Sequence, residues 1–204
     1  MARIARMTSV LATGTRQRLL GAAAQLIEEG GYGAASVIAI AERTGVAAGT
    51  LYRHFASKQE LFVEVFRVVC DRELQAMQAA AESMPPGASE VDRLETVLAI
   101  FAQRALGRPR LAWALIAEPV DSLVDAERIA YRARYAELIA GGLRRGIEAG
   151  ELPEQDVQLT AAALVGGCGE ALVGPLSPVS ASSPPALEIV ASLRTFVRRA
   201  VGAA

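Results

Sequence analysis

The 204-residue chain has little of several residue types on which enzymes and metal sites depend. It contains one histidine, one lysine, one tryptophan and two cysteines, and aromatic residues make up 5% of it. The two cysteines, Cys70 and Cys168, lie far apart in apolar runs and fit no metal or redox spacing. We therefore expect both to be buried packing residues of a protein in a reducing compartment, the cytoplasm, with no metal and no cofactor.

Segments with alternating polarity are almost absent as well, whereas apolar residues recur at helical spacing throughout. The N-terminus has no long apolar core, so we expect no secretion signal. The apolar stretch 159–176 is barely long enough to span a membrane, contains Glu170 and has Pro175 near its end. A helix that is apolar on all sides in a soluble protein is usually buried on both sides, so this stretch indicates a subunit interface instead.

The spacing predicts an all-α fold. A first helix starts near Thr15 and stops at the glycine-rich segment 30–33, and Ser57 with Glu60 forms a capping box that opens a long helix. Gly, Pro and Ser-rich breaks separate the rest. The expected helices cover about 15–29, 36–43, 47–54, 57–84, 90–107, 110–117, 121–149, 154–174 and 184–202.

Charge is unevenly distributed along the chain. Residues 1–58 carry seven basic and three acidic side chains, whereas the remainder carries 14 basic and 19 acidic ones. A basic segment on an acidic body is one footprint of a nucleic-acid-binding module. The only histidine and the only lysine, His54 and Lys58, both lie at the end of this basic part.

The segment 36–55 reads as two short helices joined at Gly45, which is a helix-turn-helix. Its second helix has three pairs of residues at a spacing of four, which would line the uncovered surface: Ala48 with Tyr52, Gly49 with Arg53, and Thr50 with His54. Lys58 lies in the first turn of the next helix, where free N–H groups already favour anions. We expect His54 and Lys58 to face one phosphate strand of DNA.

The run "GVAAGTLYRHFASKQELF" closely resembles the signature of tetracycline-repressor-type (TetR family) transcriptional regulators, and the match covers roughly residues 12–72. The resemblance implies that Ala48 and Gly49 let the helix approach base edges. Arg53 can contact guanine, the DNA backbone or only solvent. The chain departs from the pattern at Ala47, where many relatives have Ser, and at Ile38, where a polar residue is usual. The residues that the resemblance assigns to the DNA backbone are Ser36, Thr50, Tyr52, His54 and Lys58.

These observations predict three regions. Residues 1–14 form a basic flexible arm, whose Arg3 and Arg6 either touch the minor groove or belong to a frayed terminus. Residues 12–72 form the helix-turn-helix domain. The resemblance implies that 75–204 form a helical body that senses a ligand and dimerises.

The effector is expected to be apolar or amphipathic, because small-molecule sites in proteins are mostly apolar. Aromatic residues at helical spacing are also common in a plain core, so that alternative stays open. The candidate effector residues are Phe101, Trp113, Leu115, Tyr131, Tyr135 and Cys168. The candidate dimer-interface residues are Leu159, Gly166, Gly167, Leu187, Val190, Leu193 and Val197.

The predicted function is that of a bacterial, ligand-responsive repressor that binds a palindromic operator as a homodimer, with no membrane partner and no enzymatic activity. An activator of the same fold is an alternative. Two rivals come from other classes: a helical adaptor that never touches DNA, and a cysteine-dependent enzyme. A cysteine-dependent enzyme would need an imidazole partner for Cys70 or Cys168, and none remains once His54, the one histidine, is assigned to the helix-turn-helix.

Overall fold

A computed structural model describes residues 2–180 and 183–203, and the side chains among them from residue 14 onward. Its described part contains nine helical elements and no strand, which confirms the all-α prediction. The elements are α1 (Ala2–Ala34), α2 (Val37–Thr44), the 3₁₀ helix η1 (Ala48–Arg53), α3 (Lys58–Glu82), α4 (Glu90–Gly107), α5 (Pro109–Ile116), α6 (Ser122–Glu148), α7 (Val157–Leu176) and α8 (Ala186–Ala200).

Side-chain caps fix where most helices begin. Ser36, Ser57 and Ser89 each accept a hydrogen bond from the backbone N–H three residues later, at 3.0 Å. These bonds satisfy N–H groups that the first helical turn leaves free. The capping box at Ser57 differs from its prediction in one detail, because the Glu60 carboxylate accepts from the N–H of Ala56, one residue before the cap.

The first helix leaves helical geometry where the sequence predicts its stop. Gly30 has φ −148° and ψ 15°, and Gly31 has φ 74° and ψ −173°, so a last short turn follows a kink. The helix expected to start near Thr15 begins at Ala2, and the arm over residues 1–14 stays a prediction. The side chains of Arg3 and Arg6 lie outside the described residues, and their contact with DNA stays a prediction.

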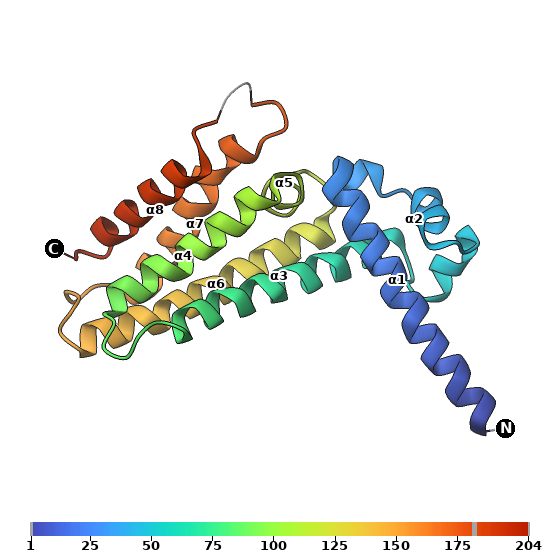
Figure 1. Cartoon of the computed structure of the whole chain (residues 1–204), viewed down its shortest axis with the longest axis horizontal. Coiled ribbons are helices and arrows are strands. Elements are labelled where there is room, and N and C mark those ends of the chain that lie inside the picture. Colours follow the sequence, from blue (N-terminus) through green and yellow to red (C-terminus); the bar gives the residue numbers. More distant parts are fainter. Residues whose placement is uncertain (1, 181–182, 204) are drawn as a thin grey trace.

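The N-terminal helices enclose a small core of their own. Leu19 and Ile27 of α1 meet Ile40 of α2, and Leu51 and Phe55 anchor η1 beneath them, each at most 2% exposed. This core continues through the first half of α3 into α5 and α6. Figure 1 shows the result: α2 and the 3₁₀ helix lie at one end of the molecule, and α3 runs from there into the body.

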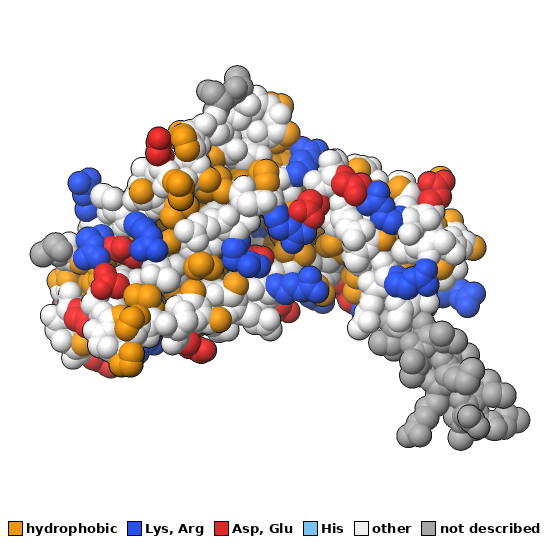
Figure 2. Space-filling model, in the orientation of Figure 1, with side chains coloured by type: hydrophobic (Ala, Val, Ile, Leu, Met, Phe, Trp, Pro, Cys, Tyr) orange, Lys and Arg blue, Asp and Glu red, His pale blue; other side chains and the backbone are white. Residues whose placement is uncertain are grey.

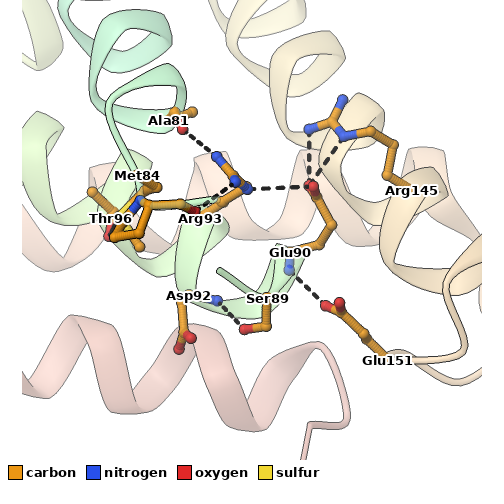
Figure 3. A network of polar contacts seen from close by, with 10 residues as sticks. Ala81, Met84, Ser89, Glu90, Asp92, Arg93, Thr96, Arg145 and Glu151 are labelled. Carbon is orange, nitrogen blue, oxygen red and sulfur yellow. Dashed lines mark hydrogen bonds and ion pairs between the residues drawn. The ribbon is translucent and has the colours of Figure 1, made fainter. Parts of the chain in front are cut away.

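The body consists of α3 to α8. Figure 1 shows α3, α4 and α6 lying lengthwise beside one another, with α7 and α8 over them. α8 packs on α4, where Arg198 pairs with Asp92 at 2.8 Å and with the largely buried Glu95 at 2.5 Å. At the end of the body away from α2, Arg145 of α6 pairs with Glu90 of α4 (Figure 3). These pairs hold α8 and α6 to α4.

The helix α7 is the one helix, within the described ranges, that is long and apolar enough to cross a membrane. An 18-residue window of this helix has a mean hydropathy of 1.4, and 28% of that window is buried in the single chain. One such helix is weak evidence for a membrane span, because a helix of a soluble assembly passes the same test. α7 packs against α4, α5, α6 and α8. These contacts cover only part of its surface, and the remaining residues of α7 are exposed in the single chain.

Candidate nucleic-acid interface and effector cavity

The turn between α2 and η1 has the geometry that a helix-turn-helix requires. α2 ends at Gly45, whose φ of 66° and ψ of 34° lie in the left-handed region that favours glycine. The N–H groups of Gly45 and Val46 donate to the carbonyls of Glu42 and Ala41, at 3.2 and 3.0 Å. The predicted break at Gly45 is therefore present, and it redirects the chain at once into η1.

The second helix is a 3₁₀ helix, where the sequence suggested an ordinary helix over about 47–54. Thr50 N–H donates to the Ala47 carbonyl at 2.8 Å, and Ala47 supplies no side-chain cap. With three residues per turn, residues three apart share a face. The predicted pairing at a spacing of four is therefore wrong, and Gly49 lies in line with Tyr52, and Thr50 with Arg53.

The surface that η1 presents is nevertheless the predicted one. Ala48, Gly49, Tyr52 and Arg53 are exposed, and Thr50 and His54 are half-buried. Leu51 is fully buried between them. Tyr52 is 56% exposed although it is aromatic, so its ring is available to a partner.

Lys58 begins α3 beside this surface. Its Nζ lies 4.9 Å from the centroid of the Phe62 ring, which is itself packed against Tyr32. A cation over a ring face is held in place without losing its charge. Lys58 has no carboxylate partner in the part of the chain whose side chains are described. It is therefore oriented and free to contact a phosphate.

Several of the other cations in the basic segment are already engaged. Arg43 forms a two-pronged ion pair with Glu29, at 2.5 and 2.8 Å. Arg16 pairs with Glu64, and Arg18 donates to the Thr44 carbonyl. Charge counting along the sequence missed these pairs, because they join residues that are 14 to 48 positions apart. The described cations that remain for DNA are Arg53 and Lys58.

A cavity of about 520 Å³ lies in the body between α3, α4, α5, α6 and α7. Four of the six candidate effector residues line it, namely Phe101, Leu115, Tyr131 and Tyr135. Trp113 and Cys168 are not among its described lining residues; Trp113 packs on the core of the body, and Cys168 is 1% exposed within that core. Helical spacing alone could not tell the two faces of α5 or α7 apart.

The aromatic side chains form a connected wall. Ring centroids of Phe101 and Tyr135 are 5.9 Å apart, those of Tyr135 and Tyr131 6.3 Å, and those of Tyr131 and Phe66 5.6 Å. The Tyr131 hydroxyl donates to Asp71 at 2.8 Å, and the Tyr135 hydroxyl donates to the Cys70 carbonyl at 3.4 Å. The wall is therefore rigid, and two of its polar groups are already hydrogen-bonded.

Burial keeps the thiol of Cys70 and the hydroxyls of Tyr131 and Tyr135 in the cavity wall uncharged near pH 7. It raises the pKa of Cys70 to about 12 and that of Tyr131 to about 12, and it raises the pKa of Tyr135 well above its usual range. Cys168 is likewise raised to a pKa of about 11 by burial. Neither thiol is a thiolate near pH 7, so neither provides a nucleophile.

Charged side chains line part of the same cavity. Arg104 is paired with Glu73 at 2.5 and 2.9 Å, and Arg108 is paired with Glu28 at 2.7 and 2.5 Å. Arg132 and Glu170 are exposed at the lining and have no ion-pair partner among the side chains that the structure describes. On the face drawn in Figure 2, blue and red side chains of the body lie next to one another, as such pairing requires. No signal in the sequence indicated that α3 lines the cavity with Phe66, Val69 and Cys70, because these residues resemble the rest of a core stripe.

One helix joins the cavity to the N-terminal domain. α5 lines the cavity with Leu111, Ala112 and Leu115, and it packs against the end of α1. Arg110 donates to the Gly30 carbonyl at 3.0 Å, and Tyr32 N–H donates to the Glu118 carboxylate at 3.2 Å. The contact is close enough that a Cβ on Gly31 would lie 2.6 Å from Glu118 and 2.8 Å from Arg110.

Comparison with known proteins agrees with this architecture. The family described as "Bacterial regulatory proteins, tetR family" matches residues 19–65. The HTH-type transcriptional repressor KstR2 of Rhodococcus jostii is 30% identical over 152 residues, which are 72% of this chain and 72% of the relative. The chain belongs to the tetR family of bacterial regulatory proteins.

Two further relatives show how far the likeness extends. KstR of Rhodococcus jostii is 35% identical over 100 residues, which are 49% of this chain and 45% of that repressor. The chain therefore matches less than half of KstR. The crystal structure of FadR from Bacillus subtilis in complex with stearoyl-CoA superposes with a TM-score of 0.71 at 22% identity, covering 91% of this chain and 97% of FadR. At that identity the superposition shows the fold alone.

Membership of the tetR family identifies the chain as a transcriptional regulator and not an enzyme. The site agrees with this assignment, since both cysteines are buried. No group of three or more His, Cys, Asp or Glu side chains that could hold a metal occurs within the described residues.

The candidate dimer residues of this tetR-family chain fall into two sets. Val190, Leu193 and Val197 lie on the face of α8 that is buried in the chain's own core. In the single chain these side chains leave little surface for a second chain, and their assignment to the interface stays a prediction. Leu159 is 68% and Leu187 80% exposed. Gly166 is exposed on α7, and Gly167 lies against Phe196 of α8.

Proposed function

We propose that the protein is a cytoplasmic repressor that binds a palindromic DNA operator as a homodimer and is released by an apolar or amphipathic effector. One observation carries the proposal: the surface of η1 is held outward by buried Leu51 and Phe55, and the unpaired Lys58 lies directly after it. In the proposed complex, η1 enters the major groove of the DNA. The phosphates on either side are contacted by Ser36, Tyr52, His54 and Lys58.

The DNA-binding step is tested by selecting bound sequences from random DNA and then titrating the selected duplex at several salt concentrations. Lys58→Ala should weaken binding to all sequences about equally and make the salt slope shallower by roughly one per protomer. Arg72→Ala is the matched control, because Arg72 is also exposed on α3 but lies 14 residues further along. Selection of no sequence, or equal slopes for Lys58→Ala and Arg72→Ala, would contradict the proposal.

The homodimer follows from the surface of α7 and α8. Spacings of four and three residues place Leu159, Ala163, Gly166 and Glu170 along one exposed face of α7, and Leu187 continues the apolar surface on α8. Small residues let a second helix approach closely, and burial of the apolar side chains stabilises the contact. A two-fold pair would place two reading helices on half-sites about 34–36 Å apart, as HTH dimers require.

The dimer is tested by analytical ultracentrifugation of Leu187→Glu. Leu187 is exposed in the single chain and would be covered by the partner in the proposed dimer. A charge there should therefore shift the protein towards monomer without unfolding it. Ile129→Glu is the control, because Ile129 is equally apolar and 69% exposed but lies on α6. Sedimentation of Leu187→Glu as a dimer at the wild-type dissociation constant would remove this face from the proposal.

The effector class follows from the cavity. Its volume of about 520 Å³ lies within the range of small-molecule sites, roughly 300–1,000 Å³, and its wall is mostly apolar and aromatic. Arg132 and Glu170 add an unpaired cation and an unpaired anion at the lining, which favour an amphipathic ligand with a charged or polar group. The FadR structure that superposes on this chain contains stearoyl-CoA, which has that character.

The effector class is tested by thermal denaturation with fatty acids, acyl-CoA esters and sugars as three separate sets. Acyl compounds should raise the melting temperature, and sugars should not. Ala105→Phe puts a ring into the cavity from α4 and should abolish the shift, whereas Ala126→Phe, exposed on α6, should leave it unchanged. Stabilisation only by hydrophilic compounds would overturn the proposed class.

Coupling between the two sites follows from α3 and α5, which line the cavity and also contact or enter the N-terminal domain. In the proposed mechanism the effector tilts α3 and changes the separation of the two reading helices. Effector and operator then weaken each other reciprocally by about 1–3 kcal/mol. Operator titrations with and without saturating effector measure this coupling, and an unchanged operator affinity would refute it.

A further inference from the structure

The N-terminal end of η1, the helix proposed to enter the major groove and called the reading helix below, carries no hydrogen-bonding side chain. Ala47, Ala48 and Gly49 are all exposed, and together they present two methyl groups and a bare backbone. In a helix-turn-helix the N-terminal residues of the reading helix are those that meet base edges. Whatever bases lie opposite Ala47 and Ala48 must therefore be recognised without a donor or an acceptor from those side chains.

The major groove offers one base feature that suits such a surface. Thymine presents a C5-methyl group there beside its O4 acceptor, whereas guanine, adenine and cytosine present hydrogen-bonding groups and no methyl group. A hydrogen-bonding edge that is covered by a methyl group loses its water without gaining a partner, which disfavours those bases. The two alanines therefore select thymine both by contact with its methyl group and by rejection of the alternatives.

The polar side chains nearby do not change this conclusion. The Ser36 hydroxyl accepts from Ala39 N–H as a helix cap, and Arg43 is held by Glu29. Arg53, one turn beyond Thr50, is the one long cationic side chain of η1. Its fork of donors matches the O6 and N7 acceptors of guanine.

A second apolar side chain extends the surface on the paired helix. Ile38 lies in the first turn of α2 and is 65% exposed, two residues after the cap Ser36. Ile40 and Ala41, which follow it, point into the core. The helix-turn-helix therefore exposes aliphatic groups on both of its helices.

We propose that the protein reads its operator mainly through thymine methyl groups opposite Ala47 and Ala48, and that Arg53 reads a guanine further along each half-site. The inference rests on the proposed DNA-binding function. It predicts half-sites with thymine at the positions that face the start of η1. It assigns base specificity to methyl contacts and to one arginine, and it assigns the remaining contacts to the phosphates.

The experiment replaces each thymine of the selected operator in turn by deoxyuridine, which lacks only the C5-methyl group. One or two replacements per half-site should weaken binding about fourfold each, the factor that corresponds to about 0.8 kcal/mol for one buried methyl-sized group. Ala48→Gly should abolish the deoxyuridine penalty at one of these positions. Ala56→Gly removes a methyl group from an exposed residue outside η1 and should leave every penalty in place.

The outcomes separate the inference from the function on which it rests. Specific binding that no deoxyuridine replacement weakens would overturn the inference and leave DNA binding intact. Failure to select any DNA sequence would overturn both. The scan with the unaltered protein decides the question even if Ala48→Gly does not fold. Arg53→Ala should lower the preference for guanine at one position by roughly tenfold, and an unchanged preference would remove Arg53 from the code.

Discussion

Replacing Gly31 by alanine tests the contact through which the N-terminal domain rests on the body. Gly31 has φ 74° and ψ −173°, a backbone region that is essentially limited to glycine. Holding alanine there costs about 1–3 kcal/mol. The new Cβ would also lie 2.6 Å from one Glu118 oxygen, 2.7 Å from the other and 2.8 Å from an Arg110 nitrogen.

The two side chains can swing away from the new methyl group, so the overlap itself is inexpensive. Their movement nevertheless breaks the bond from Tyr32 N–H to Glu118, the bond from Arg110 to the Gly30 carbonyl, or both. Each bond involves a charged group and contributes about 1.5–3 kcal/mol. With the backbone strain and the loss of one of these bonds, we expect Gly31→Ala to lower the free energy of unfolding by about 2.5–6 kcal/mol, which is a large share of a typical total of 5–15 kcal/mol.

The assay is urea denaturation followed by circular dichroism, with Gly33→Ala as the control. A Cβ on Gly33 would meet no atom within 4 Å, and its φ is not positive, so its replacement should leave the midpoint unchanged or raise it slightly. Equal midpoints for Gly31→Ala and Gly33→Ala would show that the close contact around Gly31 does not hold the domains together.

Three further predictions follow from the same structure. The log of the operator association constant should fall with log salt at a slope of about −2 for the dimer, from the phosphate contact of Lys58 in each protomer, and a slope twice as steep would show that further cations contact phosphates. Leu193→Ala should lower the free energy of unfolding by about 2–5 kcal/mol in thermal or urea denaturation, because Leu193 is buried, whereas Leu187→Ala should change it by less than about 0.5 kcal/mol under conditions where the chain is monomeric. The buried thiol of Cys70, with its pKa raised to about 12, should resist a thiol reagent at pH 8 until the protein unfolds. The stability that comes from burying the neutral Cys70 thiol should be complete below the ordinary cysteine pKa of 9.0 and be lost as the pH rises towards 12. A urea midpoint that is unchanged between pH 8 and 10.5 would contradict this prediction.

Local signals in the sequence predicted most of the helix boundaries. Ser36, Ser57 and Gly45 act within three or four residues of themselves, so their effect can be read directly from the chain. The helix type of η1, the second helix of the helix-turn-helix, could not be predicted in this way. η1 is short and begins without a side-chain cap, and its geometry depends on how Leu51 is anchored in the core of the N-terminal domain.

The differences between the expected and the observed surroundings of the candidate residues have a common physical origin. A helical stripe identifies which residues share a face, but it does not say whether that face meets the chain's own core or another molecule. Val190, Leu193 and Val197 therefore resembled an interface although α4 and the body cover them. The pairing of Arg43 with Glu29 was hidden for the same reason, because it depends on how α1 and α2 pack.

The helix α3 has a mechanical consequence for regulation. Its 25 residues contain no glycine and no proline, so it has no point at which a bend would be concentrated. Lys58 lies 12 residues before Cys70 of the cavity wall, a lever arm of about 18 Å. A tilt of about 5° at the cavity displaces the DNA end by about 1.6 Å, several times the distance range of a hydrogen bond. In the proposed mechanism, a small ligand would therefore act on the operator through the tilt of a rigid helix, and no local unfolding of α3 would be required.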